Sequence, residues 1–266
     1  MIRKKSPPQP HPRIGLSSIS VVSRKEGRNS TTLSLQFDLY HTMKAKDLKI
    51  LRKKLTKANR IDNDPLSCFS KDTLSFSVLQ KTNTEPESGL ETDDAEKNLS
   101  VKFLPSSGLS DPQLQSCFSL FERNMGDFYR NSSWGLNLDE KLAELKHDKA
   151  RFLLLTTEED DLAGFVHFRF EYDDEESPNH PVLYVYEIQI DETFRRQGLG
   201  QKLMDIAEKI AGKAGMAKVM LTVFKANTSA MDFYQKLDYS IDESSPSKFN
   251  EPADYEILSS LVDSKQ

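Results

Sequence analysis

Apolar residues follow two different periods along the second half of the chain. Short runs rich in Val, Ile, Leu and Phe, bounded by polar turns, predict strands, whereas apolar positions that recur every three or four residues predict amphipathic helices. We expect strands at 99–104, 151–156, 162–172, 182–190 and 219–224 and near 255–258, and helices from 111, over 139–147, 199–211 and 228–236. Because helices and strands alternate irregularly, this order predicts an α/β fold with a mixed sheet flanked by helices.

The residues before this region carry a different composition. The first 42 residues are rich in Ser, Pro and Arg, which predicts a disordered arm. Leu48, Leu51, Leu55 and Ala58 then recur at helical spacing in a Lys/Arg-rich run. This pattern predicts a basic amphipathic helix, which we expect to strap onto the folded domain rather than to bind a separate partner. The expected organisation is an arm over 1–42, a strapping helix over 43–66, a linker with an acidic insert over 67–97, one domain over 98–260 and a tail over 261–266.

The charge of the chain is divided unevenly. The net charge is -5, but residues 1–60 carry about +12 and the remainder about -17. An acidic domain suits a basic polypeptide substrate, although the same charge also favours solubility. The basic arm has the composition of either an organelle transit peptide or a nuclear arm. No apolar run approaches the ~20 residues that span a bilayer, so we expect no membrane insertion.

Cysteine and histidine usage excludes the common metal motifs. The two cysteines, Cys68 and Cys117, lie far apart, and the five histidines form no pair at ligand spacing. We therefore expect reduced thiols and no metal.

The stretch from Arg195 to Gly200 reads Arg-Arg-Gln-Gly-Leu-Gly and lies between a predicted strand and a predicted helix. The first amides of a helix lack intrahelical acceptors and face the positive end of the dipole, so a Gly-rich start favours phosphate binding. The alternative is an ordinary strand-to-helix turn. A dinucleotide fold requires Gly-x-Gly-x-x-Gly and a carboxylate after the next strand, and neither is present. A P-loop is excluded because no Gly-Lys-Ser/Thr follows.

In this setting the order Arg-x-x-Gly-x-Gly resembles the acetyl-coenzyme A signature of the GCN5-related N-acetyltransferase (GNAT) superfamily. About two thirds of the chain also resembles the branch that acetylates the N-terminal amine of histones. The similar segments are 58–60 with 64–66, 124–129 with 133–135, 167–170, 183–187, 219–225 and 242–247. The resemblance implies a GNAT fold, a mixed and mostly antiparallel sheet with splayed central strands. It also implies acetyl-coenzyme A as co-substrate and direct attack by the amine with water-assisted deprotonation.

The resemblance also implies which residues form the site. The coenzyme contacts are expected at Ile188, Gln189, Ile190, Arg195, Arg196, Gln197, Gly198, Leu199, Gly200, Gln201, Thr222 and Asn227. The substrate contacts are expected at Tyr129, Glu171, Tyr186, Ser244 and Tyr255. Glu171 stands where the family more commonly has Asp, which lengthens that side chain by one methylene.

The catalytic residues implied by the resemblance are Glu187, Tyr186 and Tyr184, with Glu187 accepting a proton from the amine. A terminal α-amine has a pKa near 7.7–8.0, so a weak base suffices. Period two places both tyrosines on one strand face and Glu187 on the other unless a bulge intervenes, as it does in this superfamily. Tyr234 stands where many members place an acid for the leaving thiolate, or it is a helix core residue. Trp134 forms a pocket wall or, as we favour, a core anchor.

These features predict an N-alpha-acetyltransferase acting on histone 4 and histone 2A, which begin Ser-Gly-Arg-Gly. The alternatives are a lysine or small-amine acetyltransferase and a non-catalytic acyl-coenzyme A-binding module. We expect a monomer in the nucleus and cytoplasm, with histone tails as partners and no direct nucleic-acid binding. Organelle targeting by the arm is the alternative location.

Overall fold

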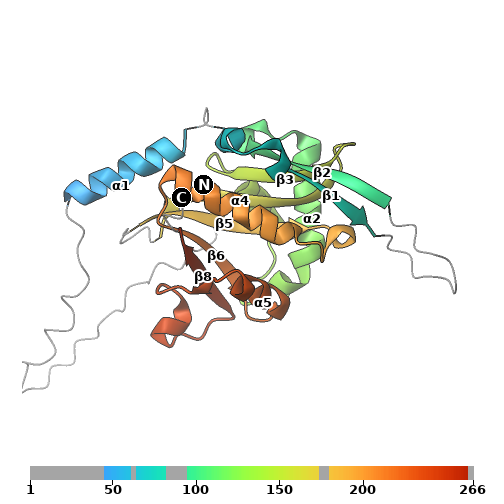
Figure 1. Ribbon diagram of the computed structural model, residues 1–266. Helices are drawn as coiled ribbons and strands as arrows, with labels where there is room; N and C mark the ends of the chain where they lie inside the picture. Colours follow the sequence, from blue (N-terminus) through green and yellow to red (C-terminus); the bar gives the residue numbers. More distant parts are fainter. Residues whose placement is uncertain (1–44, 61–63, 82–94, 174–179, 263–266) are drawn as a thin grey trace, which may run out of the picture.

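The computed structural model describes residues 45–60, 64–81, 95–173 and 180–262, and these form one eight-stranded mixed sheet with helices on both faces (Figure 1). The strands are β1 (Ser75–Gln80), β2 (Ala95–Pro105), β3 (Arg151–Thr157), β4 (Leu162–Tyr172), β5 (Pro181–Ile190), β6 (Lys218–Phe224), β7 (Ser240–Ile241) and β8 (Tyr255–Leu261). Their order is β1-β2-β3-β4-β5-β6-β8-β7. All neighbours are antiparallel except β5 and β6, which are parallel. The expected α/β fold with a mixed, mostly antiparallel sheet is confirmed.

In the described parts of the chain, five α-helices accompany the sheet: α1 (Ala45–Ala58), α2 (Asp111–Arg130), α3 (Leu138–Leu145), α4 (Leu199–Ala214) and α5 (Thr228–Lys236). Short 3-10 helices lie at Pro65–Cys68, Lys71–Thr73, Ser106–Gly108, Glu192–Phe194 and Pro246–Phe249. Local signals explain the helix ends. Ser110 and Gln113 form a capping box at the start of α2, and Gly215 ends α4 in the left-handed conformation at φ 73°. Within the described ranges, no helix combines the length and apolarity needed to cross a membrane.

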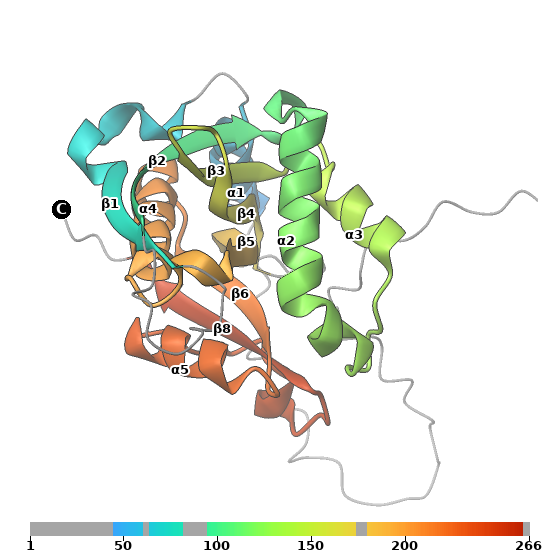
Figure 2. The ribbon, with the colours of Figure 1, turned by 90° about the vertical axis from the view of Figure 1, so that its right-hand side faces the viewer.

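Figure 2 shows the sheet between two helical layers, with α2 and α3 on one side and α4 and α5 on the other. Leu153 and Leu155 of β3 face the α4 layer, while Phe152 and Leu154 of the same strand face the α2 layer. Because both faces of the central strands are buried, these strands read as continuous apolar runs. The two layers leave the ends of β5 and β6 as the part of the sheet where the functional side chains gather.

Helix α1 packs on the α4 layer, at the side of the molecule in Figure 1. Leu51 is buried, and Leu55 and Ala58 pack against the core, so the apolar stripe seen in the sequence is the face that is covered. Beyond the helix, the Asn59 side chain donates to the Phe170 carbonyl at 3.1 Å, and Arg151 donates to the Asn59 carbonyl at 3.0 Å. These contacts attach the helix to β3 and β4.

The structure corrects the expected linker over 67–97. Its first part contains two 3-10 turns and β1, which pairs with β2, and β2 itself begins at Ala95 rather than at 99. The sequence did not predict β1, because Ser75–Gln80 is short and its apolar and polar residues alternate over only a few positions. The short strand β7 was also missed. The expected arm over 1–42, residues 82–94 of the expected linker with its acidic insert, and residues 263–266 of the expected tail over 261–266 lie outside the described residues.

Candidate active site

The sheet opens between β5 and β6. These strands pair in parallel from Val182 with Lys218 to Val185 with Leu221, and in the described strands no pairing follows. From Glu187 to Ile190, β5 therefore pairs only with β4 on its other side. One edge of the β5 backbone therefore has no partner strand there, and an extended ligand can pair with it in place of that strand. The splay expected between the central strands is present.

A β-bulge precedes the opening. Glu187 pairs with His167 and Val185 pairs with Phe168, so Tyr186 is one extra residue with no partner in β4. Because one inserted residue reverses the alternation of side chains, Glu187 changes to the face that already carries Tyr184 and Tyr186. The core confirms this, since Val185 and Ile188 both pack on the α4 layer. The three residues expected to be catalytic therefore share one face.

Glu187 is buried beneath α3 and is 5% exposed. Lys141 donates to its Oε1 at 2.8 Å, and Gln189 donates to its Oε2 at 2.8 Å. Burial raises the pKa of Glu187, and the Lys141 ammonium opposes this rise. The carboxylate is thus a weak base held in a fixed orientation.

Lys141 and Glu144 were not found from the sequence. Lys141 is 2% exposed, and its ammonium also donates to Glu144 at 2.6 Å and to the Tyr129 hydroxyl at 3.3 Å. Burial lowers the pKa of Lys141, but the two carboxylates outweigh it, and the result is well above the ordinary value. The one indication in the sequence is that Lys141 stands four residues before Leu145, on the face of α3 where core residues are expected.

His167 lies under the site on β4. Its ring is stacked between Phe152 and Tyr186, each with centroids 5.0 Å away. The imidazole is fully buried, and neither ring nitrogen has a hydrogen-bond partner among the described residues. Burial and then Arg169 hold the pKa of His167 well below its usual range, so the ring is neutral. Its contribution is a flat surface that fixes the Tyr186 ring from below, while Arg169 lies 4.3 Å over that ring.

The predicted phosphate loop forms the turn between β5 and α4. Gly198 caps the helix at φ 76°, and Arg196 also has a positive φ of 66°. The first backbone hydrogen bond of α4 runs from Lys202 to Gly198 at 3.1 Å, so the amides of Leu199 to Gln201 have no acceptor within the helix. A Cβ at Gly198 meets no described atom within 4 Å. The space beside these amides is therefore open, and it fits an anionic group.

Two of the three polar side chains of the loop, Arg195 and Gln197, form hydrogen bonds within the protein. Gln197 exchanges hydrogen bonds with the backbone of Leu79 in β1, which anchors the loop to the sheet edge. Arg195 donates to the Ile190 carbonyl at 3.0 Å and to the Asn124 side chain. Asn124 donates in turn to Gln189 at 2.9 Å, so a chain of hydrogen bonds joins the loop to Glu187.

The other expected coenzyme residues lie on β6 and α5. The hydroxyl of Thr222 is hydrogen-bonded to the Tyr184 hydroxyl at 2.5 Å. Asn227 caps α5, because its side chain accepts from the Ala230 amide at 3.2 Å.

Tyr234 is buried in the main core, where burial raises its pKa and Glu187 adds to this effect. It therefore stays protonated at neutral pH.

The expected substrate residues fall into three groups. Tyr129 and Tyr255 are buried in an aromatic cluster with Trp134 and Phe224, whose ring centroids are 5.0–6.0 Å apart. Trp134 accordingly packs against the core, as we favoured. Glu171, which is half-buried, accepts from the Tyr186 hydroxyl at 2.9 Å.

Ser244 lies in a second polar cluster, beyond the aromatic residues. Its hydroxyl donates to Asp242 at 2.6 Å, and Asp242 is paired with the buried Lys218 at 2.7 Å. Burial raises the pKa of Asp242, but hydrogen bonds from Lys218 and Ser244 outweigh it and lower the value to about 2. The ion pair therefore fixes the loop that carries Ser244.

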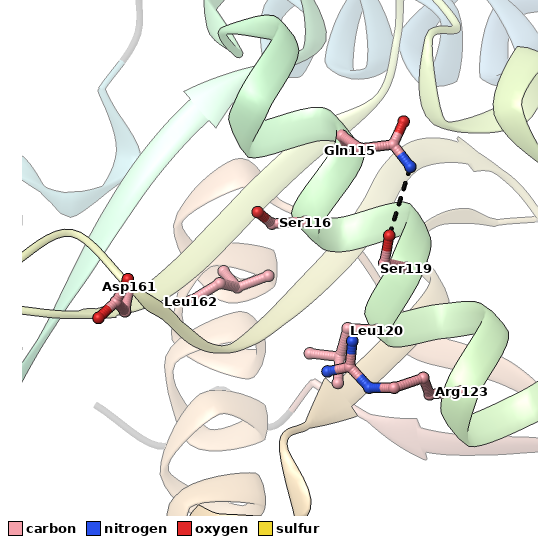
Figure 3. Close-up of a pocket in the computed structure, with 7 residues that line it drawn as sticks. All are labelled: Gln115, Ser116, Ser119, Leu120, Arg123, Asp161 and Leu162. Carbon is pink, nitrogen blue, oxygen red and sulfur yellow. Dashed lines mark hydrogen bonds between the residues drawn. The ribbon is translucent and has the colours of Figure 1, made fainter.

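A pocket of about 300 Å³ lies on α2, away from these residues (Figure 3). It is lined by Gln115, Ser116, Ser119, Leu120, Arg123, Asp161 and Leu162. None of the predicted site residues lines it. Among the residues that the structure describes, no group of His, Cys, Asp and Glu could hold a metal ion.

Residues 114–239 match the model of the acetyltransferase (GNAT) family. The match covers somewhat less than half of the chain. The splay, the bulge and the phosphate loop described above all lie within the matched residues. Glu187 and the loop before α4 are accordingly the candidate active site.

Solved structures are similar to this chain at low identity. A GNAT-family acetyltransferase from Staphylococcus aureus Mu50 is 13% identical, with a TM-score of 0.47, and the match covers 62% of this chain and 100% of that chain. The ribosomal-protein-S18-alanine N-acetyltransferase from Escherichia coli is 16% identical, with a TM-score of 0.43, covering 62% and 96%. Tetrahymena GCN5 is 11% identical, with a TM-score of 0.47, covering 61% and 96%.

Proposed function

We propose that this protein transfers the acetyl group of acetyl-coenzyme A to the N-terminal amine of proteins that begin Ser-Gly-Arg-Gly, as histone 4 and histone 2A do. The observation that carries the proposal is the bulge at Tyr186, which brings Glu187 beside Tyr184 and Tyr186 next to the open edge of β5. The resemblance of the sequence to the histone-directed branch supplies the choice of substrate.

Two backbone features fit the coenzyme. The free amides at the start of α4 and the open space at Gly198 suit the pyrophosphate, with Arg195 and Arg196 adding positive charge. The unpaired edge of β5 from Tyr186 to Ile190 suits the pantetheine arm, whose amides can extend the sheet. Bound there, acetyl-coenzyme A supplies an activated acetyl group as a thioester.

Glu187 serves as the proton acceptor in the proposed reaction. The amine nitrogen forms a bond to the acetyl carbon, the carbon–sulfur bond breaks, and one proton passes from nitrogen to the carboxylate directly or through a water. A terminal amine with a pKa near 8 is partly neutral at physiological pH, so a carboxylate of raised pKa matches the task. The same groups would act less well on lysine, whose amine has a pKa near 10.4.

Glu171 is the residue that we assign to the third-position Arg. It is half-buried and accepts a hydrogen bond from Tyr186, so its carboxylate lies on the same face of the sheet as Glu187, the proposed proton acceptor. A charge-assisted pair that is partly desolvated is worth on the order of 2–3 kcal/mol. Replacing the substrate Arg with Ala should therefore lower kcat/KM by roughly 30- to 150-fold.

The test compares three peptides by mass spectrometry: Ser-Gly-Arg-Gly, Ser-Gly-Ala-Gly and an N-terminally blocked copy that carries an internal lysine. We expect acetylation of the first at the α-amine, weak acetylation of the second and none of the third. In the Glu171→Gln variant the preference for Arg over Ala should shrink to a few-fold. Preferred acetylation of the internal lysine would instead establish a lysine acetyltransferase, and coenzyme binding without any turnover would establish a binding module.

A further inference from the structure

We infer that Lys141 is a positioning residue that keeps the Glu187 carboxylate ionised and aimed at the open edge of β5. This inference rests on the proposed function, because it concerns the proton acceptor of that reaction. Nothing in the resemblance or in the family match assigns a role to Lys141.

The Lys141 ammonium is fixed by all the groups around it. It donates to Glu187 at 2.8 Å, to Glu144 at 2.6 Å and to the Tyr129 hydroxyl at 3.3 Å, which accounts for its three N–H groups. It also lies 4.6 Å over the Phe121 ring and 5.2 Å over the Tyr129 ring. The ammonium is therefore held at one point, and Glu187 Oε1 is held with it.

The fold does not require an ionic cluster at this position. Lys141 lies on the inner face of α3, where an apolar side chain would pack against Phe121 and Leu145. Buried ion pairs contribute little net stability, and replacing all of their members with apolar residues of similar volume is often neutral, whereas removing one partner alone is costly. A buried lysine in this place is better explained by what it does to the two carboxylates that it contacts.

The other described charged and titratable groups around Glu187 do not supply the positive charge that Lys141 places beside its carboxylate. From α3, Glu144 adds a second negative charge, and from α2 and α5 the hydroxyls of Tyr129 and Tyr234 face the cluster. From β4, His167 is neutral. Arg169, also from β4, donates to the Glu144 carbonyl at 2.5 Å and covers the Tyr186 ring.

Two substitutions should therefore move the pH dependence in opposite directions. Lys141→Met removes the cation, so Glu187 should take up a proton at higher pH. Glu144→Gln removes the neighbouring negative charge and leaves Lys141 to Glu187 alone, so Glu187 should stay ionised to lower pH. Damage to the fold cannot produce shifts of opposite sign. Lys146→Met, on the exposed end of the same helix, is the matched control.

The experiment measures kcat/KM on the Ser-Gly-Arg-Gly peptide from pH 5.5 to pH 9.5 and divides each variant by the parent. This ratio cancels the ionisation of the substrate amine, which is common to all. An opposite charge at this range shifts a carboxyl pKa by about 1–3 units, so the Lys141→Met ratio should fall at least about tenfold toward acid pH. The Glu144→Gln ratio should rise toward acid pH, and the Lys146→Met ratio should stay flat.

A second readout needs no activity. The ¹³C resonance of the Glu187 carboxyl, assigned by its loss in Glu187→Gln, should titrate at higher pH in Lys141→Met and at lower pH in Glu144→Gln, both without coenzyme. If Lys141→Met fails to fold, Glu144→Gln decides, together with Lys141→Arg, which keeps the charge and should keep the parent profile.

The outcomes separate this inference from the proposed function. If Glu187→Gln is inactive but the folded variants show flat ratios and an unmoved carboxyl titration, the role of Lys141 is wrong and the function stands. If Glu187→Gln retains full activity, the assignment of the proton acceptor is wrong and the role of Lys141 falls with it.

Discussion

Replacing Glu187 with Gln is the most direct perturbation of the candidate site. The two side chains have the same shape, and the Gln carbonyl can still accept from Lys141, which lies 2.8 Å from the native carboxylate. Lys141 also keeps its pair with Glu144 at 2.6 Å. The substitution therefore removes a base and one negative charge with little change in packing, and we expect the protein to remain folded.

The expected loss follows from the role of the group. A positioned general base contributes typically 10²- to 10⁴-fold, which corresponds to roughly 2.7–5.5 kcal/mol in the activation free energy. Coenzyme affinity should be nearly unchanged, since the phosphate loop and the open edge of β5 are intact.

The assay is kcat at saturating peptide and acetyl-coenzyme A, with coenzyme affinity from calorimetry and thermal unfolding as a check on the fold. Glu96→Gln, an exposed substitution of the same kind on β2, serves as the control. A kcat within threefold of the parent in a folded protein would refute the reasoning.

Two further predictions concern the loop and the second polar cluster. Gly198 and Gly215 stand at the two ends of α4, at φ 76° and 73° with open space at both, so Val at either position imposes the same left-handed strain of about 1–2 kcal/mol or more. Calorimetry should show lost coenzyme affinity only for Gly198→Val. Equal affinities of the two variants would show that the pyrophosphate does not bind at this loop. The Asp242 pKa of about 2 should contribute roughly 2–2.5 kcal/mol of stability above pH 4, lost as pH falls toward 2. Denaturant unfolding of the parent and of Asp242→Asn should therefore differ by this amount at pH 6 and converge near pH 2, and a constant difference would contradict the assignment.

Local signals in the sequence determined most of the elements. The helix over Thr228–Lys236 and the strand over Leu162–Tyr172 match the expected bounds, because caps and apolar periods act between residues a few positions apart. The loop from Arg195 to Gly200 was equally visible, since a strand, a Gly-rich turn and a helix follow one another directly. Its positive φ at Gly198 is a property of that short stretch.

The tertiary structure alone decided the arrangement of the site. The face on which Glu187 lies depends on the register between β4 and β5, where one unpaired residue reverses the alternation, and period two by itself places it on the wrong face. Likewise, β1 is a strand because its residues pair with β2, and its own pattern is too short to show this. Lys141 reads in the sequence as one more charge on a helix surface. It is buried because α3 packs beside α2 on this side of the sheet, and only that packing brings its ammonium to the Glu187 carboxylate.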